Sequence, residues 1–158
     1  LNWYGKPVIQ GRYEGCPELK LVKYKAEILG KHLKYESEIE SLSYVWLLDN
    51  GRTQKVYVSV GNVSQHGYKS IRFWSPCFDF EKVKMTKEEK NKLLYNTLVE
   101  NGKDFMSCRF ALNDKGNLMQ VIVDQLLDTL DGDELKHGLE HVATIADRFE
   151  ERYGLDRY

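Results

Sequence analysis

The stretch 86–154 constrains the fold most, because residues that begin or end secondary structure stand at each of its joints. Thr86, with a glutamate three positions later, makes the reciprocal pattern of a capping box and predicts that a helix begins there. Apolar residues at helical spacing follow as far as Gly102, where a glycine in the left-handed conformation can end the helix. The stretch therefore opens with a helix of about fifteen residues.

A hairpin and a second helix are predicted after it. Residues 106–112 alternate apolar and polar side chains, as does 119–123, and the Asn-Asp-Lys-Gly sequence between them is typical of a turn. Asp131 and Glu134 then supply a cap for a helix that Gly154 can end. The apolar stripe of this helix consists of Leu135, Leu139, Val142, Ala146, Phe149 and Tyr153.

The first half of the sequence predicts an aromatic arm over residues 1–17, followed by one helix and three strands. Apolar residues at helical spacing predict a helix over about 18–35, which Gly30 weakens but does not interrupt. Residues 42–48 are rich in strand formers, and the Asp-Asn-Gly that follows them is typical of a tight hairpin turn. The second strand holds Val56, Val58 and Val60, and the third holds Ile71 and Phe73.

This order of elements, α-β-β-β-α-β-β-α, predicts an α+β fold in which an antiparallel sheet of about five strands is flanked by helices. A chain of 158 residues is the size of one domain, and no linker or internal repeat divides it. We therefore expect a single domain over 1–158, made of the arm 1–17 and a packed domain 18–158.

Composition narrows the possible functions. The 23 basic residues are balanced by 24 acidic ones, so we expect no nucleic-acid partner, and no apolar run is long enough to cross a membrane. Cys16, Cys77 and Cys108 are odd in number and form no Cys-x-x-Cys pair, which favours a cytoplasmic protein without disulfides or a zinc ribbon. The glycines stand singly at turns and make no phosphate-binding loop, so no cofactor is expected.

One motif suggests a metal site. His137, Glu140 and His141 spell the H-x-x-E-H order of inverted zinc peptidases. A catalytic zinc needs a third protein ligand, and this sequence offers no convincing one downstream. On a helical projection the two histidines also lie opposite the apolar stripe, so we interpret them as exposed residues and predict no metal site.

The helix predicted after Thr86 has an unusually wide apolar surface. Its apolar residues spread over about 240 degrees, more than a helix lying on one sheet can bury. Either a second copy of the chain or the aromatic arm with Trp3 and Tyr4 can cover the remainder. The candidate interface residues are Leu94, Tyr95, Leu98 and Val99.

The terminal block resembles the YbjN family and its wider relatives, the class I type III secretion chaperones. The resemblance is carried by residues 108–118 and the strand after them, and by 133–135 leading to 143–149. It implies a small bacterial α+β protein, usually dimeric, whose relatives present a sheet and hydrophobic grooves to an unfolded segment of a partner. It brings no catalytic residue with it.

These observations predict a non-enzymatic protein-binding module, chaperone-like or regulatory and homodimeric, that binds an apolar segment of an unknown partner protein. The alternative is a small-ligand-binding protein or enzyme whose site is assembled from distant polar residues such as Arg109, Asp124 and His66.

Overall fold

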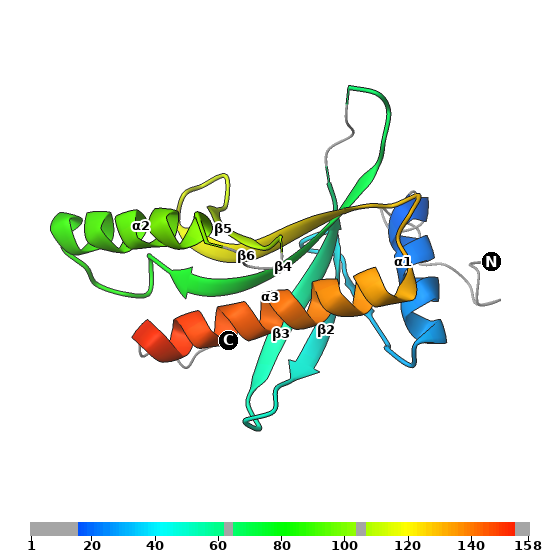
Figure 1. Cartoon of the computed structure of the whole chain (residues 1–158), viewed down its shortest axis with the longest axis horizontal. Coiled ribbons are helices and arrows are strands. Elements are labelled where there is room, and N and C mark those ends of the chain that lie inside the picture. Colours follow the sequence, from blue (N-terminus) through cyan, green and yellow to red (C-terminus); the bar gives the residue numbers. More distant parts are fainter. Residues whose placement is uncertain (1–15, 62–64, 104–106, 154–158) are drawn as a thin grey trace.

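The computed structural model describes residues 16–61, 65–103 and 107–153, which form three helices and a six-stranded antiparallel sheet (Figure 1). The strands lie in the order β1-β2-β3-β4-β6-β5, so β1 and β5 are the two edges. The predicted α+β class is confirmed, with one strand more than expected. The elements are α1 Pro17–Ile28, β1 Lys34–Glu36, β2 Ser41–Leu47, β3 Thr53–Val60, β4 Ser70–Asp79, α2 Lys87–Asn101, β5 Arg109–Leu112, β6 Leu118–Leu126 and α3 Gly132–Tyr153.

The first helix is shorter than predicted. α1 ends at Ile28 rather than near residue 35, because Gly30 has a φ of +72° and turns the chain away. The Lys31 N–H donates to the Ala26 oxygen at 2.9 Å, which is the long hydrogen bond of a Schellman helix end. The prediction was wrong because it treated Gly30 as an interior residue.

The early end of α1 allows an additional strand to form. β1 pairs with β2 in the register Lys34↔Ser43 and Glu36↔Ser41, and the Ser43 hydroxyl donates to Glu36 Oε1 at 2.8 Å. The predicted arm 1–17 falls almost entirely outside the described residues. Pro17, which the prediction assigned to the arm, is instead the first residue of α1, a position that proline favours.

The two helix starts predicted from capping residues are confirmed. The Glu89 N–H donates to Thr86 Oγ1 at 3.1 Å, and the Thr86 N–H donates to the Glu89 carboxylate at 2.8 Å, which completes the capping box of α2. Asp131 and Glu134 make the same reciprocal pair before α3, at 2.8 and 3.3 Å. The predicted left-handed end of α2 is wrong, because Gly102 has a φ of −77°.

The predicted hairpin forms between β5 and β6, with a shorter first strand than expected. β5 begins at Arg109, after the buried Cys108, and Met106 lies outside the described residues. β6 is longer than expected, because it pairs along nearly its whole length with β4. The hairpin is thereby joined to the first four strands through the β4–β6 pair.

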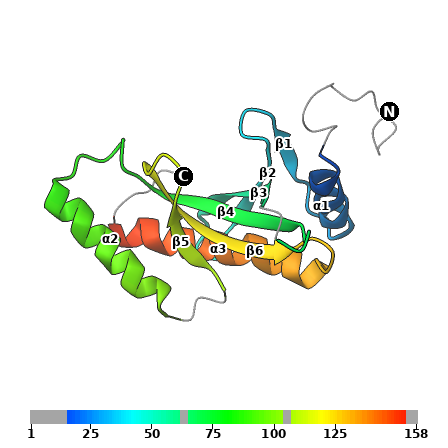
Figure 2. The same ribbon diagram turned by 90° about the horizontal axis from the view of Figure 1, so that it is seen from above.

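The core lies between the sheet and the two helices α1 and α3. α3 runs across β4, β3 and β6, and α1 packs beside its start against β2 and β3 (Figures 1 and 2). Gly138 allows the close approach of α3, because a Cβ atom there would lie 2.7 Å from a ring carbon of the fully buried Phe73. The predicted stripe of α3 is buried at Leu135, Leu139, Val142, Ala146 and Phe149.

One polar contact crosses this core. The Gln54 side chain of β3 donates from Nε2 to the Glu150 carboxylate of α3 at 3.0 Å and also lies 3.0 Å from the Ser75 hydroxyl. All three residues are buried. A buried polar group must be hydrogen-bonded to avoid a large desolvation cost, so this contact fixes the position of α3 on the sheet.

Candidate protein-binding surfaces

Strand β2 is covered by β1 along only part of its length. β1 pairs with residues 41–43, and no other described strand lies beside residues 44–47 on that side. We call this segment the β2 edge. Because the Leu48 N–H bonds to the Arg52 oxygen of the β3 side at 2.9 Å, the alternation of an antiparallel ladder turns the backbone groups of Val45 and Leu47 outward. These are the groups that an added strand would use.

The side chains of the β2 edge are also suited to contact with another chain. Val45 is 57% exposed and Leu47 is 69% exposed. On the opposite side of the strand, Tyr44 and Trp46 are half-buried, and Lys31 Nζ lies 5.4 and 4.7 Å from their ring centroids. An extended segment lying here would contact aliphatic side chains on one face and the Lys31-covered aromatic pair on the other.

The hollow beside Trp46 continues this surface onto α3. It has a volume of about 230 Å³ and lies between the β2–β3 turn and α3, where Thr144 and Asp147 line it. The Arg52 guanidinium is 2.7 Å from the Asp147 carboxylate, so the charge of Asp147 on this wall is paired. The hollow offers room for a side chain next to the β2 edge.

The second surface is the outer side of α2. Tyr95 is 68% exposed, Leu98 70% and Val99 49%, whereas Leu94 is half-buried. We call these four residues the α2 apolar face. The helix buries Leu93 and Thr97 on its opposite side. Tyr95, Leu98 and Val99 are thus exposed on this face, while Leu94 also packs partly against the core. The alternative cover, the arm with Trp3 and Tyr4, lies outside the described residues.

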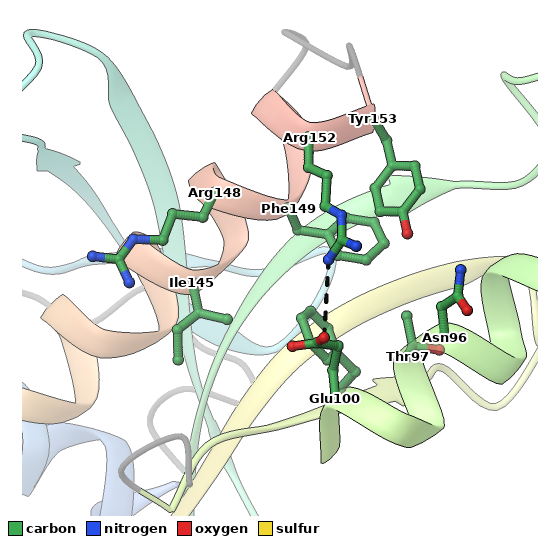
Figure 3. A pocket seen from close by; sticks show the side chains of 9 residues that line it. Asn96, Thr97, Glu100, Ile145, Arg148, Phe149, Arg152 and Tyr153 are labelled. Atoms are coloured by element: carbon green, nitrogen blue, oxygen red, sulfur yellow. Dashed lines mark ion pairs between the residues drawn. The ribbon is translucent and has the colours of Figure 1, made fainter. Parts of the chain in front are cut away.

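A small cleft separates α2 from the end of α3 (Figure 3). Its volume is about 180 Å³, and Phe110 of β5 and Phe149 of α3 form part of its apolar wall, with ring centroids 5.1 Å apart. At the rim Arg152 Nη1 lies 3.9 Å from Glu100 Oε1, the contact drawn as a dashed line. The cleft is too small for a cofactor of ordinary size.

The residues of the alternative site come together only in part. Asp124 of β6 accepts hydrogen bonds from Arg72 of β4 at 2.8 and 3.0 Å and from Arg109 of β5 at 2.8 Å. Burial raises the pKa of Asp124, but the bonds from the two arginines outweigh it and hold the pKa below its usual value. His66 lies in the exposed connection between β3 and β4.

This arrangement does not favour acid–base chemistry, because a carboxylate whose pKa is lowered and whose oxygens accept three hydrogen bonds is a poor general base. Sequence reasoning missed the contact of Arg72 with Asp124, which it faces directly in the β4–β6 register. The pairing of residues so distant in sequence could be found only by aligning the two strands.

The H-x-x-E-H motif lies on α3. The rings of His137 and His141 stack with centroids 5.0 Å apart; His137 is exposed as predicted, but His141 is half-buried beside a hollow that Cys108 also lines. Burial raises the pKa of Cys108 to about 11, so the thiol stays protonated at neutral pH. Across residues 16–61, 65–103 and 107–153, no three His, Cys, Asp or Glu side chains are arranged to hold a metal ion.

Within residues 16–61, 65–103 and 107–153, each helix is either too short or too polar to cross a membrane.

The helices and sheet described above have the fold of the type III secretion chaperones. The similar structures include the Yersinia pestis type III secretion chaperone SycH, solved in complex with a stable fragment of YscM2. That chain is 16% identical, with a TM-score of 0.52 over 84% of this chain and 98% of the other. Another is the HopA1-SchA chaperone-effector complex, at 12% identity and a TM-score of 0.51, covering 92% of this chain and 99% of the other.

No protein-family model and no curated protein sequence matches the chain. The chaperone-like fold expected from the sequence is thus confirmed by structure, and membership of the YbjN family stays a prediction. At these identities the likeness concerns the fold.

Proposed function

We propose that this chain is a non-enzymatic protein-binding module, chaperone-like or regulatory, that binds an apolar segment of a partner protein in the cytoplasm. The observation that carries the proposal is the β2 edge, where outward backbone groups and exposed aliphatic side chains coincide at Val45 and Leu47. Strand addition uses both features, because the main chain supplies hydrogen bonds and alternate side chains supply specificity. The similar structures, whose chaperones are bound to protein partners, support this direction.

We further propose that the α2 apolar face joins two copies of the chain. Exposed aliphatic and aromatic residues on one helix are a typical site of self-association, and most homodimers use the same patch from both copies. The cytoplasmic setting is supported by Cys16, Cys77 and Cys108, because these three cysteines form no disulfide bond. An enzymatic role through Arg109, Asp124 and His66 has less support, since the Asp124 oxygens already accept bonds from two arginines.

The test is a proline substitution that blocks only the outward side of β2. Val45→Pro removes an N–H that points to the open edge and leaves the β2–β3 ladder intact, because proline is tolerated on edge strands. Val45→Thr is the matched control, which keeps the N–H and the β-branched shape. Partner segments would be captured from lysate of the native host with the wild-type chain, mapped, and measured as synthetic peptides by fluorescence titration.

We expect Val45→Pro to weaken peptide binding by about tenfold or more, because the peptide loses a hydrogen bond and its carbonyl is left unsatisfied. Val45→Thr should change it by a few-fold at most. Equal affinity of wild type and Val45→Pro would contradict binding at the β2 edge. Turnover of a metabolite by the purified chain would contradict the non-enzymatic role.

A further inference from the structure

The opposite edge of the sheet, strand β5, is in contact with a side chain from α2. Asn101, the last residue of α2, accepts a hydrogen bond on Oδ1 from the Phe110 N–H at 2.7 Å. The same side chain donates from Nδ2 to the Phe110 carbonyl oxygen at 3.0 Å. One side-chain amide therefore takes both backbone groups of one strand residue.

The direction of these backbone groups follows from the hairpin. The Asn113 N–H bonds to the Leu118 oxygen across the β5–β6 turn at 2.9 Å, so alternate residues back along β5, Ala111 and Arg109, also face β6. Phe110 and Leu112 consequently turn their backbone groups away from the sheet. Phe110 is thus the inner of the two positions in β5 to which another strand could bond.

The side chain of asparagine carries the same amide group as the peptide backbone. Asn101 therefore supplies the donor and the acceptor that a residue of a neighbouring antiparallel strand would supply. Its position is held by the buried Leu93 and Thr97, which anchor α2. At the β2 edge, by contrast, no described side chain is hydrogen-bonded to the outward groups of Val45 or Leu47.

We propose that Asn101 blocks strand addition at Phe110 of the β5 edge and thereby restricts it to the β1–β2 side of the sheet, where the β2 edge is open. Closure of β5 stands on the two Asn101 hydrogen bonds alone, whereas the restriction to β2 rests on the proposed function. Unprotected edge strands are templates for pairing with other chains, and proteins block them by several means. A chain with both edges open could pair β5 of one copy with β2 of the next, a head-to-tail contact that does not close.

The test compares Asn101→Ala with Asn96→Ala in the full chain. Asn96 lies on the same helix and is also half-buried, and the side-chain hydrogen bonds to the Phe110 backbone come from Asn101, so Asn96 controls for the change in helix propensity. The first measurement is hydrogen exchange of the Phe110 amide by NMR. The second is the mass of the particle by light scattering over a hundredfold range of concentration.

We expect the Phe110 amide to exchange about tenfold faster or more in Asn101→Ala, as the loss of one hydrogen bond allows, and to be unchanged in Asn96→Ala. The mass of Asn101→Ala should rise with concentration beyond that of the wild type. Adding Val45→Pro to Asn101→Ala should abolish this extra association if copies join β5 to β2. Persistence of that association in the double variant would contradict the restriction to β2.

An Asn101→Ala chain with wild-type mass and wild-type Phe110 exchange would overturn the closure of β5. If Asn101→Ala does not fold, the wild-type chain decides, because a Phe110 amide that exchanges as fast as a free peptide amide would also overturn it. Asn101→Asp offers an intermediate case, since it keeps the acceptor and places a negative charge against the Phe110 carbonyl. The proposed function is tested separately, by the affinity of Val45→Pro for the partner peptide. If that test contradicts the proposed function, the Phe110 exchange result still decides whether Asn101 closes β5.

Discussion

Replacing Leu98 with lysine should separate a dimer formed through the α2 apolar face. Leu98 is 70% exposed, and full burial of a leucine side chain stabilises by about 1.5–3 kcal/mol. Covering the exposed part therefore contributes about 1–2 kcal/mol in each copy. A two-fold contact contains two such residues, so Leu98→Lys should weaken the dimer by about 2–4 kcal/mol, which is about 30- to 700-fold in Kd.

The assay is light scattering or sedimentation at several concentrations, in which the monomer is recognised by its mass of 18.5 kDa. The matched control is Ile28→Lys. Ile28 is 68% exposed at the last residue of α1, so the same change is made at an equally exposed aliphatic residue near a helix end. A mass profile of Leu98→Lys that coincides with those of the wild type and Ile28→Lys would refute the α2 contact.

Three further predictions concern stability. Gly138→Ala should destabilise the fold by about 1–2 kcal/mol in chemical denaturation, because overpacking against the ring of Phe73 outweighs the gain of about 1 kcal/mol in helix propensity. The control is Gly132→Ala, whose added methyl group meets only a flexible leucine side chain, and it should be near neutral. Thr86→Ala should lower the unfolding free energy by about 1 kcal/mol through loss of the α2 cap, and an unchanged denaturation midpoint would contradict this. Because the folded pKa of Asp124 is lowered, its contribution to the unfolding free energy is present above the unfolded pKa of about 3.9 and is lost as the pH falls through the folded pKa. In thermal unfolding, Asp124→Asn should therefore reduce the fall in melting temperature over that acidic range.

Elements whose signals are local could be predicted from the sequence. The capping boxes at Thr86 and Asp131 each lie within four residues, so the starts of α2 and α3 were predicted correctly. The end of α1 was not, because Gly30 can be an interior glycine or a left-handed terminator, and the choice depends on whether the residues after it find a partner. β2 supplies that partner to β1, which at three residues is too short to show an alternating pattern.

The candidate site depended more heavily on tertiary structure. Val45 and Leu47 are typical residues of a buried strand in the sequence. Their side chains are exposed because α1 and α3 pack on the other face of the sheet, and their backbone groups are open because β1 is short; the sequence reveals neither. The contact of Arg72 with Asp124 depends on the register of two strands far apart in the chain. By contrast, the exposure of Leu98 and Tyr95 could be predicted, because a helix that packs on one side cannot bury apolar residues around most of its circumference.

The buried pair of Gln54 and Glu150 has a consequence for the alternatives open to the chain. A helix whose contacts with a sheet are only aliphatic can shift by one turn, about 5.4 Å, and still bury its side chains among apolar residues. Here such a slip would strand a carboxylate and an amide in the interior without hydrogen bonds, at a cost of several kcal/mol. The hydrogen-bonded pair thus selects one position of α3 along the sheet. The shape of the hollow beside Trp46, which α3 partly lines, depends on that position.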